Sequence, residues 1–168
     1  MKDSKIIEFE ESKCIVCNKN NSNSFLSKNV LGLKFLLVKC SCSFIYLNPR
    51  PTIKSIAFFY SLKYMPHNNK NLSYIFKILQ KITFNWKYRL IKKYLKSDST
   101  LLDVGSGDGE FASFISKKHL KIDQYDQFSG IKNTFVKKKN YNIITLWHSL
   151  EHFHDIDDIM KKINNSSL

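Results

Sequence analysis

In the C-terminal part of the chain, short apolar runs alternate with segments of helical period. The runs at 101–104, 121–125 and 141–147 have the length and composition of buried strands. Residues 110–118 and 156–163 carry apolar side chains at the three- and four-residue steps of amphipathic helices. Strands that alternate with helices in this way predict an α/β fold, in which crossover helices connect the strands of a parallel sheet.

The preceding segment, residues 52–97, is helical in period. A short first helix is expected from Thr52 to Tyr60. From Tyr74 onward, apolar side chains recur at three- and four-residue steps, at Ile75, Leu79, Ile82, Trp86, Leu90 and Tyr94. We expect this stripe to pack on the following domain. A basic amphipathic helix could instead lie on a membrane surface.

Residues 13–51 hold all four cysteines and little helical periodicity. An Asn/Ser-rich run at 18–24 predicts a loop. Two short apolar stretches, Leu33–Val38 and Phe44–Leu47, predict strands on either side of the second cysteine pair. The chain therefore divides into a small cysteine-containing module (13–51), a helical connector (52–97) and an α/β domain (98–168).

Composition places the chain among globular proteins, since hydrophobic residues make up 43% of its 168 residues. No apolar run reaches the length of about 18 residues that suggests a membrane-spanning helix. The first 12 residues also lack the apolar core of a signal peptide. We therefore expect a cytoplasmic protein.

The net charge of +13 is unevenly distributed, because no Asp or Glu lies between Ser12 and Ser97, a stretch with 16 Lys and Arg. Such a basic surface could meet polyanions. Lysines, however, outnumber arginines by 25 to 2 in the whole chain. Recognition of phosphate and guanine by paired hydrogen bonds favours arginine, so nucleic acid is not the partner we expect.

Three glycines at alternate positions, Gly105, Gly107 and Gly109, separate the first predicted strand of the α/β domain from its helix. Without side chains, the backbone there can turn sharply and approach a ligand, while the amides of the helix N-terminus point toward it. Asp126 follows the second strand about 20 residues beyond this loop, where a carboxylate can accept both hydroxyls of a ribose. Asp123 is a weaker candidate for that role, because it lies within the strand.

The stretch Leu101–Phe111 resembles motif I of class I methyltransferases and departs from the dinucleotide-binding G-x-G-x-x-G spacing. The resemblance implies S-adenosylmethionine as cofactor. It also implies that the acidic residue and the glycine loop hold the methionine end of that cofactor. The residues concerned are Asp103, Gly105, Ser106, Gly107 and Gly109.

The stretch from Tyr141 to Asp155 resembles the fourth-strand segment of one methyltransferase group, written fDvItlwhvLEHlpD. The resemblance implies that Trp147 and His148 border the cofactor, and that the pair Glu151–His152 faces the reacting end. Either member of that pair is a candidate base, or alternatively a structural helix cap. His148 to His152 also spells the metalloprotease pattern H-x-x-E-H, which would need a third ligand downstream.

Two cysteine pairs, Cys14-x-x-Cys17 and Cys40-x-Cys42, predict a tetrahedral Zn²⁺ site, because thiolates stay reduced in the cytoplasm and bind zinc strongly. Together with the stretch 44–51, they resemble the zinc-ribbon module in front of many bacterial methyltransferases, which commonly ends in CGLVFLNPRP. Ser43 replaces the glycine, and one residue is missing between the second pair of cysteines. The resemblance implies a small acceptor, often a sugar or another metabolite.

A class I methyltransferase domain usually has seven strands in the order 3-2-1-4-5-7-6. This chain supplies strands 2-1-4 of a partial Rossmann-like sheet, because only residues 127–140 separate the second and fourth strands. We expect a C-terminally truncated domain, in which the fourth strand forms a bare sheet edge unless something such as a partner chain covers it. The alternatives are a half domain that a partner chain completes and a compact binding module without turnover. The alternative to a methyltransferase is a non-catalytic zinc-binding module whose basic surface binds polyanions or a partner chain.

Overall fold

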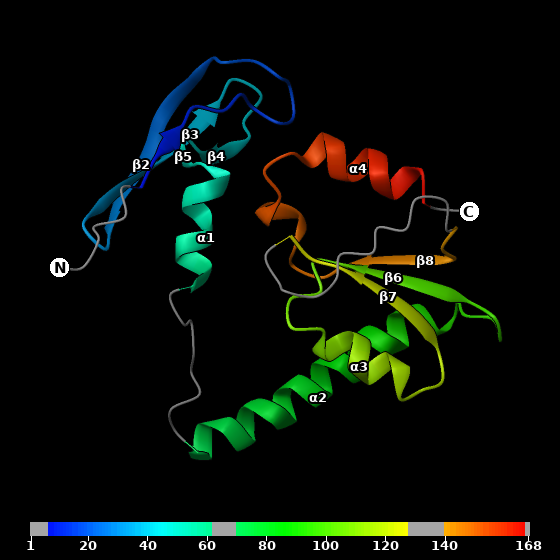
Figure 1. Cartoon of the computed structure of the whole chain (residues 1–168). Helices are drawn as coiled ribbons and strands as arrows, with labels where there is room; N and C mark the ends of the chain where they lie inside the picture. The colour runs from blue at the N-terminus through cyan, green and yellow to red at the C-terminus, as the bar shows by residue number, and fades with distance from the viewer. Residues whose placement is uncertain (1–6, 62–69, 128–139, 167–168) are drawn as a thin grey trace. The chain divides into compact units, whose positions relative to one another are not determined.

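A computed structural model describes residues 7–61, 70–127 and 140–166. The chain forms two compact units, Met1–Tyr64 and Met65–Leu168 (Figure 1). The first unit contains antiparallel strands and one helix, and the second contains a parallel sheet with helices. The mixed α/β fold predicted from the sequence is therefore confirmed.

The first unit contains two small antiparallel sheets, with strand orders β1-β5 and β2-β3-β4. Its elements are β1 (Phe9–Glu10), β2 (Ser22–Val30), β3 (Leu33–Cys40), β4 (Ile45–Leu47), β5 (Arg50–Pro51) and α1 (Ile53–Ser61). Leu31 and Gly32 join β2 to β3 with φ angles of 53° and 76°, as a two-residue type I′ turn requires. The loop predicted at 18–24 is wrong at its end, because β2 already begins at Ser22.

Pairing between β2 and β3 explains why polar residues enter a strand there. Ser22 lies opposite Cys40, and the register continues to the turn apart from one irregularity between Ser24 and Leu26. Strand β3 has the apolar composition of a strand, and its backbone offers the hydrogen-bonding groups with which β2 pairs. The neighbouring strand therefore overrides the turn-like composition at the start of β2.

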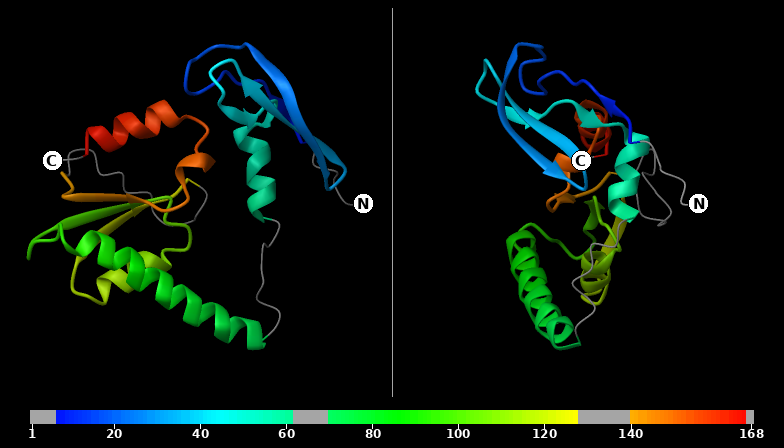
Figure 2. Two further views of the ribbon diagram at one scale, coloured as in Figure 1. Left: turned by 180° about the vertical axis from the view of Figure 1, so that it is seen from behind. Right: turned by 90° about the vertical axis from the view of Figure 1, so that its left-hand side faces the viewer.

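The second unit is built on a parallel sheet of β6 (Thr100–Val104), β7 (Lys121–Tyr125) and β8 (Ile143–Leu146). Its order, β7-β6-β8, is the 2-1-4 order expected from the sequence. The helices are α2 (Lys70–Lys92), α3 (Glu110–Ser116), the 3₁₀ turn η1 (Leu150–His152) and α4 (Ile156–Asn164). Figures 1 and 2 show α4 on one face of the sheet, and α2 and α3 on the other.

Alternation along β6 decides which side chains meet which helices. Leu102 and Val104 are fully buried in the core cluster that includes Ile159 of α4. Leu101 is fully buried in the opposite cluster, with Phe111 of α3. Because side chains of a strand alternate between its two faces, Asp103 shares the face of Leu101. This alternation delivers a carboxyl group to the face that α2 and α3 cover.

Helix α2 packs through a different face from the one predicted. The residues that contact the core are Phe84, Tyr88, Ile91 and, just beyond the helix, Leu95. The predicted stripe is exposed at all six positions: Ile75, Leu79, Ile82, Trp86, Leu90 and Tyr94. The prediction that this stripe packs on the following domain is therefore wrong.

Two further predictions concern the chain around this sheet. Residues 128–139, where the sequence is too short for a further helix, strand and helix, lie outside the described residues. Within the described sheet, β8 forms the edge next to β6, as expected. None of the helices seen in the described ranges is both long and apolar enough to cross a membrane.

Candidate functional site

The glycine loop at the carboxyl end of β6 has three residues in left-handed conformation. Gly105, Gly107 and Gly109 have φ angles of 77°, 54° and 74°, which side chains strongly disfavour. A Cβ atom on Gly105 would lie 2.1 Å from Cβ of Ser149, whereas one on Gly107 would meet nothing within 4 Å. Ser149 is buried and donates a hydrogen bond to the carbonyl of Val104 at 2.8 Å. Close packing therefore requires glycine at position 105.

Backbone hydrogen bonds attach this loop to the end of β7. The amides of Gly105 and Ser106 donate to the carbonyl of Tyr125 at 2.7 and 3.2 Å. The amide of Gly107 donates to Oδ2 of Asp126 at 2.8 Å. Asp126 thus lies directly beside the loop, where the sequence placed a ribose-binding carboxylate. Asp123, the weaker candidate, accepts a hydrogen bond from the hydroxyl of Tyr141 at 2.8 Å.

Asp103 is the buried carboxyl group of this site, with 3% of its surface exposed. It lies opposite Thr145 in the parallel register, and the Thr145 hydroxyl donates to its Oδ1 at 2.7 Å. Burial raises the pKa of Asp103, although the Thr145 hydrogen bond and the charge of Lys87 act in the opposite direction. The carboxylate is consequently held in a site that lacks enough water to solvate it fully.

Lys87 brings a cation from α2 to the same place. Its Nζ lies 4.8 Å from the ring centroid of Trp147, 5.4 Å from that of Phe111 and 5.9 Å from that of Phe84. Burial lowers the pKa of the Lys87 ammonium, and the charge of Asp103 partly offsets this effect. Aromatic ring faces and a carboxylate together form a site suited to a positive charge.

These groups border one cavity of about 230 Å³. Its lining residues are Gln80, Phe84, Lys87, Asp103, Gly105, Ser106, Gly107, Asp108, Glu110, Phe111 and Trp147. The Ser106 hydroxyl and the Trp147 indole nitrogen are buried and have no hydrogen-bond partner within the described part of the chain. Two buried polar atoms left unsatisfied on the wall of one cavity indicate a site that a polar ligand completes.

The structure brings together most of the residues assigned to the cofactor loop. Five of the predicted cofactor residues line the cavity: Asp103, Gly105, Ser106, Gly107 and Trp147. Gly109 instead caps the N-terminus of α3, and Asp126 contacts the cavity wall through its hydrogen bond to Gly107. Both lie next to the cavity rather than on its lining.

The residues predicted around the reacting end lie after β8. His148, Glu151 and His152 are exposed, and none of them lines the cavity. His148 lies in a bend with φ of 53°, and His152 ends the three-residue turn η1. The two histidines therefore do not lie on one face of an α-helix, as the metalloprotease pattern requires. The backbone carbonyl of His152 accepts a hydrogen bond from Gln127.

Sequence reasoning missed the contribution of α2 to this cavity. Lys87, Gln80 and Phe84 reach it from that helix, and the Gln80 amide donates a hydrogen bond to Glu110 at the start of α3. A signal was present in the sequence, because Phe84 begins a second apolar series, completed by Tyr88, Ile91 and Leu95. Lys87 lies on the same side of the helix as that series.

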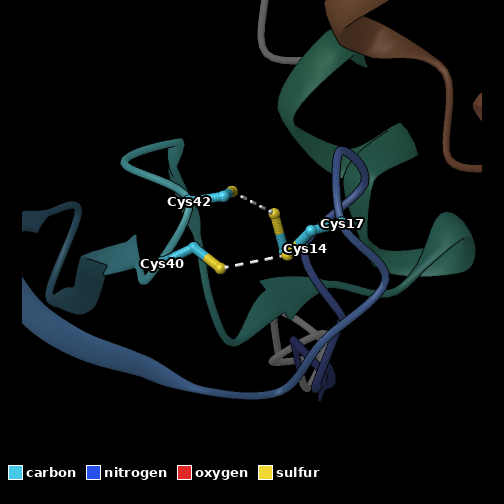
Figure 3. A group of neighbouring side chains, drawn as sticks. All are labelled: Cys14, Cys17, Cys40 and Cys42. Atoms are coloured by element: carbon cyan, nitrogen blue, oxygen red, sulfur yellow. Dashed lines mark hydrogen bonds between the residues drawn. The ribbon is translucent and has the colours of Figure 1, made fainter.

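The four cysteines of the first unit form a second candidate site (Figure 3). Cys14 and Cys17 lie in the segment before β2, Cys40 ends β3, and Cys42 follows in the turn to β4. Their Sγ atoms all lie within 4.8 Å of one another, with Cys14–Cys42 at 3.5 Å and Cys17–Cys40 at 3.4 Å. A tetrahedral zinc site with bonds of about 2.3 Å has sulfur–sulfur edges of about 3.8 Å. All four are free thiols, and the donor set fits a metal.

Hydrogen bonds within the cluster shift the pKa values of its thiols in opposite directions. The backbone N–H of Cys42 is the main cause that lowers the pKa of Cys40 to about 6. Although the backbone N–H of Lys19 acts to lower it, the hydrogen bond with Cys40 raises the pKa of Cys17 to about 12. One thiolate is thus favoured while a neighbouring thiol keeps its proton, because two adjacent thiolates would repel each other.

Comparison with known proteins agrees with this geometry. A family model described as a methyltransferase domain matches residues 71–167, which is more than half of the chain. The match covers α2, the whole parallel sheet and the glycine loop, while the four-cysteine cluster precedes it. No curated protein matches the chain. The chain therefore belongs to this methyltransferase domain family and carries, ahead of the matched domain, a four-cysteine cluster consistent with a zinc-binding module.

Proposed function

We propose that the second unit binds S-adenosylmethionine in the cavity at the end of β6 and transfers its methyl group to a small acceptor. The observation that carries this proposal is the pair of unsatisfied buried atoms, Ser106 Oγ and Trp147 Nε1, on the wall that also holds Asp103. A glycine loop with room for a ligand against Gly107 supports the same assignment.

The charges of the cavity match those of the proposed cofactor. The methionine end of S-adenosylmethionine carries an ammonium and a carboxylate, and the neighbouring sulfonium is positive. Asp103 offers a buried carboxylate for a cation, and Lys87 offers an ammonium for an anion. The ring faces of Trp147 and Phe111, which now face Lys87, suit a positive sulfonium.

Further residues complete the proposed cofactor site. Gly105, Gly107 and Gly109 would shape the loop, and Asp126 would accept the ribose hydroxyls. His148 would border the cofactor after β8, beside Trp147. Here the proposal depends on the resemblance noted in the sequence, and on the position of Asp126 next to Gly107.

When bound, the cofactor supplies an electrophilic methyl group. The residues of the chain would orient the acceptor in line with it and remove a proton where the acceptor is a hydroxyl or a carbon acid. Either Glu151 or His152 is the proposed general base, since both are exposed after β8 and therefore accessible to an acceptor. By resemblance, the acceptor is a sugar-like or other small metabolite.

Titration calorimetry with S-adenosylmethionine tests the cofactor assignment. Wild-type protein should release or absorb heat with one site per chain. Asp103→Asn and Asp126→Ala should weaken binding roughly tenfold or more, because each removes a charged hydrogen-bonding group. Asp157→Asn makes the same change of charge on α4, across the sheet, and should bind like wild type. A folded, monodisperse sample that gives no heat would refute the proposal.

We also propose that Cys14, Cys17, Cys40 and Cys42 hold a structural Zn²⁺ ion in a cytoplasmic protein, where thiols stay reduced. Metal analysis should find one zinc per chain, and Cys17→Ser should lower that content and the melting temperature of the first unit. Ser43→Ala, which keeps all four thiols, should retain the zinc. Purified protein whose melting temperature does not respond to zinc or to a chelator would contradict this assignment.

A second candidate function follows from the acid-free stretch between Ser12 and Ser97. A non-catalytic zinc-binding module could use this basic surface to bind polyanions, and a partner chain could cover the β8 edge. Heparin affinity that falls steeply with salt, together with no binding of S-adenosylmethionine in calorimetry, would favour this function over methyl transfer.

A further inference from the structure

Helix α2 presents a row of large apolar side chains to solvent. Ile75, Leu79, Ile82 and Trp86 are 56%, 56%, 60% and 55% exposed. Their spacing of three and four residues places them along one line of the helix. A helix of a soluble protein normally packs such a stripe against the core of the protein, so the exposed row on α2 needs another explanation.

The core of the second unit does not use this row. Phe84, Tyr88 and Ile91 pack on the sheet and α3 from the other side of α2. Figures 1 and 2 show α3 and the sheet on one side of α2, and no other described element of its unit on the opposite side. The helix therefore has two apolar faces. On the outward one, the ring of Trp86 contacts that of Trp147, with 6.2 Å between centroids, whereas Ile75, Leu79 and Ile82 are more than half exposed.

Exposed cations lie all around α2 and just after it. At 100° per residue, Arg89 and Lys93 lie nearest to the apolar row, whereas Lys77, Lys81 and Lys92 lie on other faces of the helix. No acidic residue occurs in the helix or anywhere between Ser12 and Ser97 to neutralise them. A partner for this face must therefore combine an apolar interior with negative surface charge.

We propose that α2 docks the second unit on the surface of an anionic lipid bilayer. The row from Ile75 to Trp86 enters the boundary between headgroups and acyl chains, and Arg89 and Lys93 beside it contact the anionic headgroups. Trp86, with its apolar ring and polar N–H, suits that boundary. Ile75, Leu79 and Ile82 do not line the cofactor cavity, so the inference does not depend on methyl transfer.

Vesicle sedimentation tests the proposal with full-length protein. Protein should sediment with vesicles of phosphatidylcholine and phosphatidylserine, remain in solution with phosphatidylcholine alone, and be released by salt. Ile82→Glu should weaken partitioning roughly tenfold or more, because an anion replaces an apolar side chain that the bilayer would bury. Met160→Glu, the same type of change at an exposed position of α4, should sediment like wild type.

Fluorescence locates the contact. Trp86 and Trp147 are the two tryptophans of the chain, so Trp147→Phe leaves Trp86 as the single reporter. Its emission should shift to the blue, and brominated lipids should quench it, only with anionic vesicles. Equal binding to neutral vesicles, or equal loss in Ile82→Glu and Met160→Glu, would overturn the proposal. Lipid-independent self-association that Ile82→Glu abolishes would assign the face to a second copy of the chain instead.

Discussion

Replacing Gly105 by alanine tests the tightest packing in the glycine loop. The new Cβ would lie 2.1 Å from Cβ and 2.7 Å from Oγ of Ser149, distances at which the chain must move. The residue also has φ of 77°, where an alanine costs about 1–2 kcal/mol. Overpacking adds about 1–3 kcal/mol, so we expect a loss of about 2–5 kcal/mol. Domains of this kind are stable by about 5–15 kcal/mol, so the loss is measurable.

Gly107→Ala is the matched control, because it has a similar φ of 54° but no atom within 4 Å of the new Cβ. It should cost only the backbone term of about 1–2 kcal/mol. Urea unfolding followed by tryptophan fluorescence measures both, since Trp86 and Trp147 lie in the second unit. Equal losses for the two variants would refute the packing argument.

Ser149→Gly in the Gly105→Ala background separates the contact from the backbone strain. The two closest contacts, with Cβ and Oγ of Ser149, would then be gone, and Cα of residue 149 would lie 3.5 Å from the new Cβ, which is ordinary contact. The single change Ser149→Gly loses its hydrogen bond to the Val104 carbonyl and is itself destabilising. The double variant should nevertheless be more stable than the sum of the two single losses by about 1–3 kcal/mol. Simple additivity would show that the two residues do not clash.

Three further predictions concern other buried or capping groups. Burial raises the pKa of Asp103, so the native state binds this proton more tightly than the unfolded chain does, where the pKa is near 3.8. The free energy of unfolding should therefore fall as pH rises from 3.8 through the raised pKa. Urea unfolding of Asp103→Asn at a series of pH values should not show this fall, and a fall as large as that of the wild type would contradict the expectation. Thr145→Val removes the donor to the Asp103 carboxylate and should cost about 1–3 kcal/mol at pH 7, and less in acid, by the same measurement. Asp155→Ala removes the N-cap of α4, whose side chain accepts from the amide of Asp158 at 2.8 Å. It should cost about 1 kcal/mol in thermal unfolding, whereas Asp155→Asn should cost little.

The parallel sheet was predictable because local pattern and tertiary role agree there. Leu101 and Leu102 make β6 apolar on both of its faces, as a strand covered by helices on both sides requires. The glycines that follow mark the end of β6 and the loop together. The position of Asp103 on the α2 side then follows from the alternation of the strand alone.

The start of β2 in the cysteine-containing module was less predictable, because the composition there indicates a loop whereas the segment pairs as a strand. The run from Asn18 to Ser24 has the residues of a loop, yet its end pairs with β3 from Ser22 onward. Only the partner strand, which is distant in sequence, decides where such a segment becomes extended. The cysteine spacing, by contrast, identified all four members of the cluster, since each pair needs only a short local turn.

The face of α2 that packs inward was mispredicted, and magnitudes show why. Turning the helix to bury Ile75, Leu79 and Ile82 would gain roughly 1.5–3 kcal/mol for each side chain, but would expose the inward aromatic face at a similar cost. The apolar terms therefore nearly cancel, and no hydrophobic pattern can decide between the two faces. The same turn would also take Lys87 away from the buried carboxylate of Asp103, whose pKa it lowers. With the apolar terms this close, the contacts that Lys87 makes with the rings of Trp147 and Phe111, and its attraction to Asp103, favour the observed orientation. Hydrophobic period alone does not contain these contacts, and they leave the apolar row on the outward side.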